Sequence, residues 1–405
     1  MNTGLTESAV KRAQTGLLIG GILVMFTQLA ISSNCFSLFV IPICEDLGFA
    51  RGQFSMLQSL GSLGGAVASF LSGNLFSKKG IVRIMRIGAI GTAIAYSMQS
   101  ISTHLWQFGI ICFIVGFCNT LGTSMPLALL IGDWFSGNRN TITGIVMTGS
   151  GFGSSLFMNI ASSLILNYGW RTAQHILVVI MAVISLGVDF LLLKEPPKAL
   201  APKSAEKLPE EGSKTAPAVN FFTPLNILMG CIMAVIAIGV SCSMSPITPF
   251  LQDIGYSQSF AAAVYSGVMI SSAIGKIFHG MALDKLGVKA SCSIMLILAI
   301  IGVLATIFFK SPIFSVPLAL GVFFVSSLQV VASPAIADYL VGAENKKFFL
   351  GKLNIFISVG YFIGPLLYGA LYDHFGSYIP GFWVAVAVYG LSLAAVQLLL
   401  GRKKA

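Results

Sequence analysis

Charged residues are scarce in this 405-residue sequence, and their scarcity excludes an ordinary soluble protein. They make up 9% of the chain, whereas about 25% is usual in soluble domains. Hydrophobic residues reach 56%, and there are 43 glycines. Charge-free stretches of about 20 residues, enough to cross a bilayer as a helix, recur along the chain. The composition therefore predicts a membrane protein.

The sequence also lacks the patterns of catalytic and cofactor-binding proteins. Its seven cysteines have no paired spacing, so we assign them to packing rather than to disulfides or a metal site. No nucleophile with a neighbouring base, metal-ligand cluster or phosphate-binding loop is visible. The net charge of +10 is not concentrated in a soluble basic domain. We expect no enzymatic activity, no cofactor and no nucleic-acid partner.

Acidic residues are few, and none is expected in the membrane interior. All 14 can be placed at loops or helix ends, with Asp189 and Asp338 nearest to a span. We therefore predict no buried carboxylate. Such an absence disfavours a sodium site built on side-chain charge, and also a drug–proton antiporter that relies on an embedded acid.

The apolar stretches predict twelve membrane helices, because a helix satisfies its backbone amides internally in lipid. The first, residues 17–44, is too long for the apolar core of a signal peptide. Four of the 24 basic residues fall outside the predicted cytoplasmic positions: Arg51, Arg171 and Lys310 on the outer side, and Lys276 within a span. This asymmetry predicts a multi-pass protein of the cytoplasmic membrane with both termini in the cytoplasm. The predicted spans begin near Leu17, Gly52, Ile87, Leu105, Asn140, Thr172, Thr223, Ser259, Ala290, Pro312, Leu353 and Tyr378.

The chain divides into two halves around a polar segment. Residues 194–222 are rich in proline, lysine and glutamate and are predicted to form a cytoplasmic linker between six-helix bundles of residues 1–193 and 223–405. An internal repeat supports this duplication. Gly73-Asn-Leu-Phe-Ser-Lys-Lys-Gly80 in the first half corresponds to Gly280-Met-Ala-Leu-Asp-Lys-Leu-Gly287 in the second, 207 positions later.

These two loops resemble the signature loop of the major facilitator superfamily, roughly G-x-x-x-D-R/K-x-G followed by basic residues. The resemblance covers the whole chain and implies an all-α membrane protein of twelve helices in two pseudo-symmetric bundles, working as a monomer in the lipid bilayer. In that family the acid of the loop latches the cytoplasmic gate. Asp284 matches the acid, whereas Ser77 replaces it in the first copy, so the first latch is absent or reduced to a hydroxyl hydrogen bond. The implied gating residues are Gly73, Ser77, Lys78, Gly80, Arg83, Gly280, Asp284, Lys285 and Gly287.

Further motifs resemble the oxalate–formate antiporter and monocarboxylate transporter families. They are Trp134-Phe135 with Arg139, the glycine ladder of residues 144–153, Gly169-Trp-Arg-Thr172, and Gly275-Lys276 ahead of Gly280. We interpret the glycine ladder as close helix packing rather than a nucleotide loop.

In those families a cation four residues before the loop glycine of span 8 binds the substrate carboxylate, and Lys276 occupies that position. Oxalate carriers have a second lysine in span 11, where this chain has Ile355, Phe356 and Ile357. A single cation favours a monocarboxylate over a dicarboxylate. Monocarboxylate transporters carry an aspartate where this chain has Ser272, so proton coupling by that acid is unsupported.

Lys276 is also unusual on physical grounds. Residues 254–275 before it carry no charge, and a lysine in hydrocarbon costs roughly 2.5 kcal/mol or more. Anion binding is one explanation, and snorkelling or pairing with a backbone carbonyl is the alternative. His279, about one turn further on, is a candidate proton relay together with Lys276. Its alternative role is a hydrogen-bonded histidine near the gate.

The sequence therefore predicts a secondary transporter that moves a small organic anion, a monocarboxylate, by alternating access, as exchange or proton symport. Efflux of hydrophobic compounds or drugs is the alternative, and it would be insensitive to Lys276. A receptor or sensor is a competing class, but no segment is long enough for a signalling domain. Candidates for the cavity wall, with interhelical hydrogen bonding as the alternative role, are Gln28, Asn34, Asn119, Thr123, Tyr265, Gln329 and Tyr361.

Overall fold

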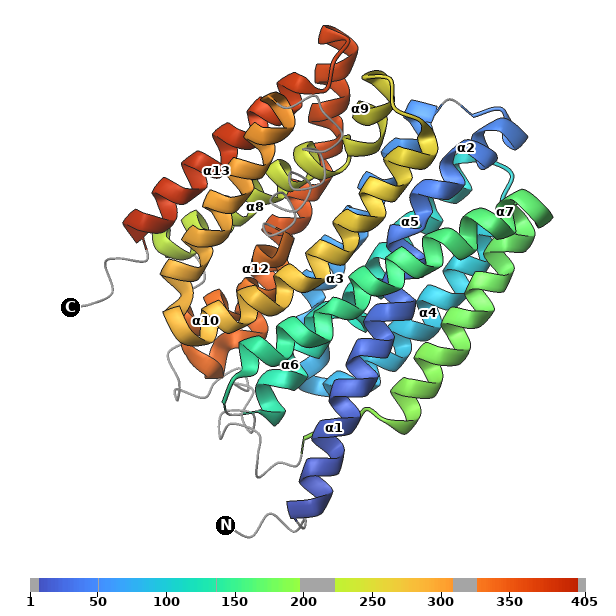
Figure 1. Cartoon of the computed structure of the whole chain (residues 1–405). Helices are drawn as coiled ribbons and strands as arrows, with labels where there is room; N and C mark the ends of the chain where they lie inside the picture. Colours follow the sequence, from blue (N-terminus) through green and yellow to red (C-terminus); the bar gives the residue numbers. More distant parts are fainter. Residues whose placement is uncertain (1–6, 50, 136, 197–222, 309–325, 400–405) are drawn as a thin grey trace.

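The computed structural model describes residues 7–49, 51–135, 137–196, 223–308 and 326–399. These residues form a bundle of long helices that run side by side (Figure 1). The π-helical segments η1 and η3 interrupt two of them. The elements are α1 (Glu7–Val24), η1 (Met25–Asn34), α2 (Phe36–Leu47), α3 (Arg51–Lys79), α4 (Ile81–Ile101), α5 (Leu105–Gly122), α6 (Ser124–Trp134), α7 (Arg139–Leu191), α8 (Pro224–Met244), α9 (Ile247–Asp253), α10 (Gln258–Phe308), η3 (Leu328–Ala332), α12 (Ser333–Phe375) and α13 (Ile379–Leu399).

Three of these elements each contain two helices joined by a sharp turn. The 53 residues of α7 would extend about 80 Å as one helix, far beyond the ~30 Å of a bilayer core. A glycine with positive φ breaks each element: Gly169 in α7, Gly287 in α10 and Gly342 in α12. Glycine adopts this left-handed backbone without steric cost. The turns in α7 and α10 therefore each join two passes through the bundle (Figure 1), whereas the part of α12 before Gly342 is a short continuation of η3.

The described helices have the length and apolar surface that a bilayer requires. Eight helical stretches among them are long and apolar enough to cross a membrane. Large hydrophobic side chains such as Ile94, Leu166 and Val183 are exposed on the flanks of the bundle. The all-α membrane fold predicted from the sequence is confirmed. The start of the predicted tenth span at Pro312, and residues 197–222 of the predicted linker, lie outside the described residues.

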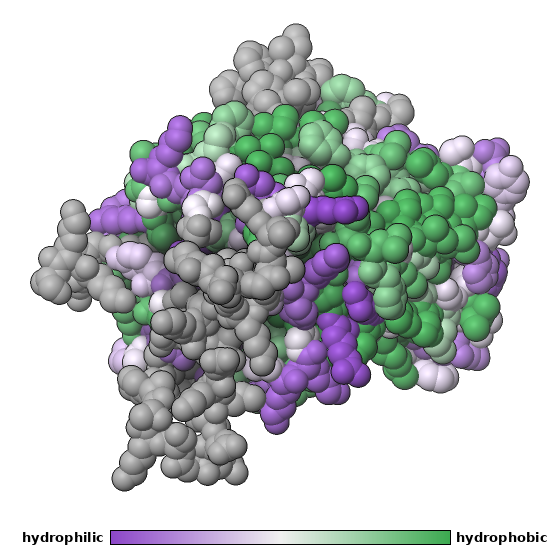
Figure 2. Space-filling view, turned by 90° about the horizontal axis from the view of Figure 1, so that it is seen from below, coloured by the Kyte–Doolittle hydropathy of each residue, from purple (hydrophilic) through white to green (hydrophobic). Residues whose placement is uncertain are grey.

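The end of the bundle at which α1 begins also carries the start of the linker, and we call it the linker end. Trp134, the last residue of α6, donates a hydrogen bond from its indole nitrogen to the carbonyl of Lys194 at 3.1 Å. Figure 2 views the molecule from this end: hydrophilic residues gather on this face, and hydrophobic residues cover the flank beside it. The polarity pattern agrees with helices that emerge from a membrane here.

The two halves meet along two seams. In the Lys276 seam, residues 139–168 of α7 pack against residues 258–286 of α10, and in the Ser69 seam α3 packs against residues 343–375 of α12. A Cβ added at Gly144 would overlap the carbonyl oxygen of Lys276, and one at Gly351 would overlap that of Ser69. Lys276 and Ser69 each stand four residues before the first glycine of their repeat copy. The two seams are therefore equivalent positions of the duplicated fold.

The glycine ladder in α7 packs as the sequence predicts. A Cβ at Gly149 or Gly153 would overlap a backbone carbonyl of the first helix, and one at Gly151 would overlap the carbonyl of Met269 in α10. Helices approach this closely only where a side chain is absent. The interpretation of these glycines as packing residues is confirmed, and they hold α7 between the two halves.

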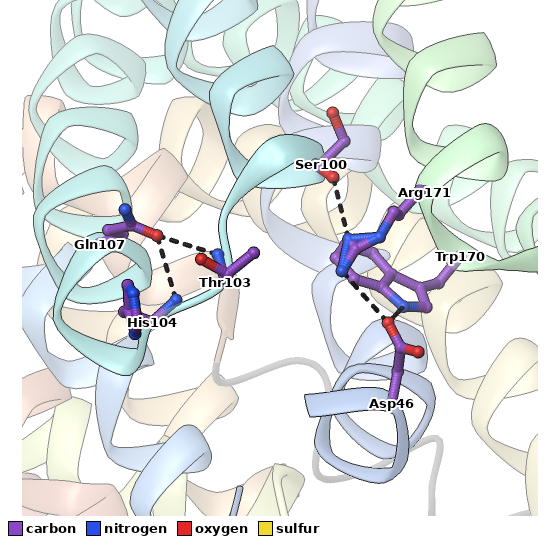
Figure 3. Close-up of polar contacts among 7 residues, drawn as sticks. All are labelled: Asp46, Ser100, Thr103, His104, Gln107, Trp170 and Arg171. Atoms are coloured by element: carbon purple, nitrogen blue, oxygen red, sulfur yellow. Dashed lines mark hydrogen bonds and ion pairs between the residues drawn. The ribbon is translucent and has the colours of Figure 1, made fainter. Parts of the chain in front are cut away.

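At the end opposite the linker, the polar contacts drawn in Figure 3 tie helices of the first half to one another. Asp46, near the end of α2, accepts a hydrogen bond from the indole nitrogen of Trp170 at 3.0 Å and pairs with Arg171 at 3.2 Å. The Arg171 guanidinium also lies 4.3 Å from the centre of the Trp170 ring. In the same view, the Gln107 side-chain oxygen accepts the Thr103 and His104 amides and caps α5. These contacts stiffen the first half without joining it to the second.

Candidate functional site

Lys276 lies at the interface of the two halves and is almost completely buried. Its side chain is 7% exposed. Its ammonium donates to the carbonyl of Met147 at 3.2 Å and to the hydroxyl of Ser150 at 2.8 Å, both on α7. An ammonium has three donors, and these two contacts use two of them. The contact with a backbone carbonyl is the alternative role considered from the sequence, and it leaves one N–H for another acceptor.

A strip of polar contacts runs along α7 from Lys276 toward the first helix. Ser154 donates to the carbonyl of Ser150 at 2.5 Å, and the side-chain amide of Asn34 donates to the Ser154 hydroxyl at 2.5 Å. Asn34 is the last residue of η1, and Ser33 beside it lines a cavity. The strip therefore connects the surroundings of Lys276 with the cavity edge.

The cavity has a volume of about 410 Å³ and lies between helices of both halves. Its wall comes from η1 and α2–α6 of the first half and from α12 of the second. Three of the residues predicted to face a cavity, Asn119, Thr123 and Tyr361, are in this wall. Lys276 is not, so in this arrangement the cation and the cavity are neighbouring rather than continuous sites.

A buried hydrogen-bond network supports one side of the cavity. Asn119 donates to the hydroxyls of Ser32 at 2.7 Å and Ser33 at 3.1 Å. Gln28, which is fully buried in η1, donates to the Asn119 side-chain oxygen at 3.4 Å. Thr123 separates α5 from α6, and its hydroxyl donates to the Asn119 carbonyl at 2.6 Å. The backbone breaks at η1 and Thr123 thus bring amide groups together at mid-bundle.

The remaining predicted site residues of the second half lie away from the cavity wall. His279 is fully buried, and its Nδ1 is 2.6 Å from the hydroxyl of Ser327. Gln329 in η3 is 5% exposed, and its amide has no hydrogen-bond partner among the described residues. Tyr265 is partly buried and packs against the hydrophobic core. Ser272, at the position of the missing aspartate, shares a 3.0 Å hydrogen bond with Ser326.

At the linker end, Asp284 joins the two halves through the first turn of α7. Its carboxylate accepts the Thr141 backbone amide at 2.8 Å, the Thr141 hydroxyl at 2.6 Å and the Asn140 side-chain amide at 2.8 Å. A carboxylate at a helix N-terminus is favoured by the unpaired amides and the helix dipole. Gly280 allows the approach, because a Cβ there would overlap the Asn140 carbonyl. The exposed Lys285 and the turn at Gly287 follow.

The first repeat copy makes no equivalent latch among the described residues. Ser77 is exposed, and its hydroxyl donates back to the Gly73 carbonyl of its own helix at 2.8 Å. Gly73 packs against the Phe348 ring instead of a backbone carbonyl. Gly80 takes a positive φ of 83° ahead of α4. Lys78 and Arg83 are exposed around this turn.

Two ion pairs accompany the contacts at the linker end, one beside each seam. Arg139 at the start of α7 pairs with Asp338 of α12. Lys347 of α12 pairs with Asp133 of α6 at 3.1 Å. Both pairs join the first half to the second. With the Asp284 contacts, they close the linker end of the interface in this structure.

The prediction that no carboxylate is buried was wrong. Asp189, near the end of α7, is fully buried, and neither carboxylate oxygen has a hydrogen-bond partner among the described residues. The Arg86 side chain donates to the Asp189 backbone carbonyl at 3.1 Å. The sequence placed Asp189 at a helix end, where exposure is usual. Helix α1 covers this end, because Gly20 packs directly on Val188 and Leu192.

Sequence reasoning also missed two residues in the cavity wall. Ser69 and Tyr96 are each 1% exposed, and their hydroxyls have no hydrogen-bond partner among the described residues. A serine or tyrosine in an apolar span is common and gives no sequence signal of its own. The repeat offered one clue, since Ser69 is the counterpart of Lys276. Their positions in the cavity wall follow from tertiary packing.

The sequence is similar to those of known membrane transporters. The sequence model of the Major Facilitator Superfamily matches residues 18–241 and 227–405. Monocarboxylate transporter 12 of Xenopus laevis is 24% identical, covering 96% of this chain and 88% of its own, and monocarboxylate transporter 13 of Rattus norvegicus is 24% identical, covering 90% and 85%.

Solved structures share the fold at low sequence identity. The transporter FucP, crystallised in the outward conformation, superposes with a TM-score of 0.72 at 14% identity, covering 95% of this chain and 98% of its own. The human organic anion transporter TETRAN superposes with a TM-score of 0.69 at 16% identity, covering 96% and 99%.

Proposed function

We propose that this chain, which belongs to the Major Facilitator Superfamily, transports a small organic anion with one carboxylate by alternating access. Membership of this family makes it a multi-pass membrane transporter rather than an enzyme. The anion, the cytoplasmic membrane and the cytoplasmic position of the linker end belong to the proposal. Transport runs as exchange or as proton symport.

The observation that carries the proposal is the buried ammonium of Lys276 at the interface. Its two partners, Met147 and Ser150, are neutral groups, so the positive charge is hydrogen-bonded but no described residue neutralises it. A buried charge without a counter-ion is costly. A substrate carboxylate would supply the missing negative charge and accept the third N–H. One cation neutralises one carboxylate, which favours a monocarboxylate, and relatives at 24% identity are named as monocarboxylate transporters.

Alternating access gives the two partners of Lys276 a second role. Both lie on α7, in the opposite half. If the halves separate at the linker end, the Asp284 contacts and these two bonds break together. A bound carboxylate would replace the lost α7 acceptors in the open state, so that substrate and helix compete for the same ammonium. Such differential binding is what allows a ligand to shift a conformational equilibrium.

Lys276 and the nearby His279 are also the candidates for proton coupling. His279 lies close to Lys276 in sequence, and its Nε2 has no hydrogen-bond partner among the described residues. Proton symport would use Lys276, with His279 as relay, whereas exchange would need neither to change protonation. Efflux of hydrophobic compounds, the alternative, fits less well, because the wall of the adjacent cavity is rich in hydroxyl and amide groups.

The test is transport in proteoliposomes that contain the full chain, with labelled lactate, oxalate and malate as probes. Lys276→Gln should lower lactate transport about 10- to 100-fold, because a hydrogen bond to a charged group contributes roughly 1.5–3 kcal/mol. Lys276→Arg should retain part of it. Lys289→Gln removes a charge from the same helical element and serves as the matched control. A folded glutamine variant with unchanged lactate transport would overturn the proposal.

A further inference from the structure

The cavity wall has a chemistry that differs from that of Lys276. Of its 21 lining side chains, ten carry a hydroxyl and three a carboxamide, and none carries a formal charge. Most of these polar groups belong to the first half. A wall of this kind forms hydrogen bonds in both directions, because hydroxyls and amides both donate and accept. It can therefore form hydrogen bonds with the hydroxyl groups of a ligand.

Two hydroxyls in this wall are buried without a protein partner. Ser69 and Tyr96 are each 1% exposed, and neither side-chain oxygen has a hydrogen-bond partner among the described residues. A buried polar group that makes no hydrogen bond costs roughly 1–3 kcal/mol. Other wall groups, such as Asn119, already have protein partners. A ligand that reaches these two hydroxyls from the cavity would supply the partner that they lack among the described residues.

The cavity is also large for a short carboxylic acid. Its volume of about 410 Å³ equals the share of about fourteen water molecules at ~30 Å³ each. A two- or three-carbon acid has only a few heavy atoms and would leave most wall groups unbound. A chain of about six carbons with a hydroxyl on most of them would reach several wall groups at once.

The internal repeat relates the cavity hydroxyl of Ser69 to the ammonium of Lys276. Ser69 and Lys276 stand at equivalent positions of the two halves: Ser69 is in the cavity wall and its buried hydroxyl has no partner among the described residues, whereas Lys276 places an ammonium in the opposite seam. The Asn34–Ser154–Ser150 strip runs from Lys276 to Asn34, beside Ser33 at the cavity edge. We propose that the substrate is a polyhydroxylated monocarboxylate of the sugar-acid type, whose hydroxyls bind Ser69 and Tyr96 in the cavity and whose carboxylate pairs with Lys276 when movement of the two halves joins the neighbouring sites. The carboxylate end of this inference rests on the proposed function, and the hydroxyl end does not.

The test uses three probes that separate charge from hydroxylation: D-gluconate has both, hexanoate has the carboxylate alone, and D-glucitol has the hydroxyls alone. Dissociation constants are measured by calorimetry on the full chain in lipid nanodiscs, with empty nanodiscs subtracted. Gluconate should bind at least about ten-fold more tightly than hexanoate, since two hydrogen bonds of ordinary strength are added.

Variants assign the effect to the two hydroxyls. Ser69→Ala and Tyr96→Phe remove hydroxyls that bond to none of the described residues, so folding should be preserved. Each should weaken gluconate binding about five-fold and leave hexanoate unchanged. Ser392→Ala is the matched control, because Ser392 is also buried without a partner among the described residues but is not in the cavity wall.

The outcomes separate the two proposals. Hexanoate binding as tightly as gluconate, binding of neither, or equal weakening of both probes by the Ser69 and Tyr96 variants would overturn the hydroxyl site. If glucitol binds as well as gluconate and Lys276→Gln changes neither, the hydroxyl site stands and the anion proposal fails. If hexanoate binding depends on Lys276 but gluconate has no advantage, the anion proposal stands alone.

Discussion

The Lys276 seam and the Ser69 seam occupy equivalent places in the duplicated fold, but they differ in charge. In the first, an ammonium bonds to α7 and a carboxylate, Asp284, caps the same helix. In the second, both positions are serines: Ser69 lines the cavity and Ser77 bonds to its own helix. The packing glycines are kept in both seams.

The difference in charge between the seams suggests that packing is required in both halves, whereas anion binding is required in only one. Close helix packing is needed on both sides, so small residues are present on both. A buried charge is costly, and one ammonium is sufficient to attract one anion. The neutral seam then remains available for hydrogen bonding to the uncharged part of a ligand. The comparison can be tested by changing equivalent residues in pairs.

The largest difference is expected between Asp284→Ala and Ser77→Ala. Removing Asp284 deletes three hydrogen bonds to the first turn of α7, which we expect to destabilise the closed linker end by about 3 kcal/mol. Hydrogen–deuterium exchange of residues 139–145 measures this directly, because the Thr141 amide is one of the donors. Exchange there should become faster by roughly 100-fold.

Ser77→Ala is the control for that measurement. The Ser77 hydroxyl bonds within its own helix, so exchange at the start of the second helix of α12, residues 345–352, should hardly change. Comparable acceleration at the two places would mean that the seams are latched alike, against the contacts described above.

A smaller difference is expected between Gly280→Ala and Gly73→Ala. The new methyl group at position 280 meets the backbone carbonyl of Asn140, whereas at position 73 it meets the ring of Phe348 at 2.6 Å. A ring can rotate aside, but a helix backbone must move as a whole. Overpacking of this kind costs roughly 1–3 kcal/mol, and we expect Gly280→Ala to lie in that range and Gly73→Ala below it. Thermal unfolding in detergent compares the two, and equal losses would contradict the prediction.

The smallest effect concerns Glu195, a charge beside the Ser69 seam. Its carboxylate accepts the Val82 amide at 2.7 Å and caps α4. Although Glu195 as a whole is exposed, partial desolvation of its carboxyl raises the pKa above the ordinary value of 4.5, and the hydrogen bond from Val82 lowers it in part. Because the folded pKa is raised, the charged form is disfavoured by folding. Stability from this group is therefore present below about pH 4.5 and is lost as the pH rises through the folded pKa.

Glu195→Gln should remove that pH dependence, since glutamine can accept the same amide without a charge. We expect the variant to be more stable than the wild type at pH 7 by under about 1 kcal/mol, and equal to it near pH 4. Thermal unfolding at the two pH values measures the difference. Glu45→Gln, an exposed glutamate at the opposite end, serves as control. A less stable Glu195→Gln variant at pH 7 would show that the charge stabilises the cap.

Much of the fold was predictable because long apolar stretches with few charges indicate membrane helices. The repeat at Gly73 and Gly280 identified the duplication, and the glycines of α7 identified a packing face that the structure confirms. The contact of Asp284 with the first turn of α7 agrees with the family resemblance, which implied that the acid of this loop joins the two halves. The burial of Asp189 was not, since its exposure depends on how α1 covers the end of α7.

Local sequence was least informative about the cavity. Gln28 and Asn119 look alike as mid-span polar residues, but Asn119 lines the cavity and Gln28 supports it from behind. Tyr265 and Tyr361 likewise gave the same signal, and of the two only Tyr361 is in the wall. A polar side chain in a span must be satisfied somewhere, and the sequence does not say whether by a helix or by a ligand.

The sequence alone was enough to determine the membrane character of the helices, the duplication and the isolated cation at Lys276. A bilayer restricts the length, hydropathy and charge of each segment, and these properties can be read along the chain without knowing its fold. The partners of Lys276 on α7, the free hydroxyls of Ser69 and Tyr96 and the burial of Asp189 required the folded chain. These depend on which helix faces come within hydrogen-bonding distance, and that is set by packing between residues more than 100 positions apart.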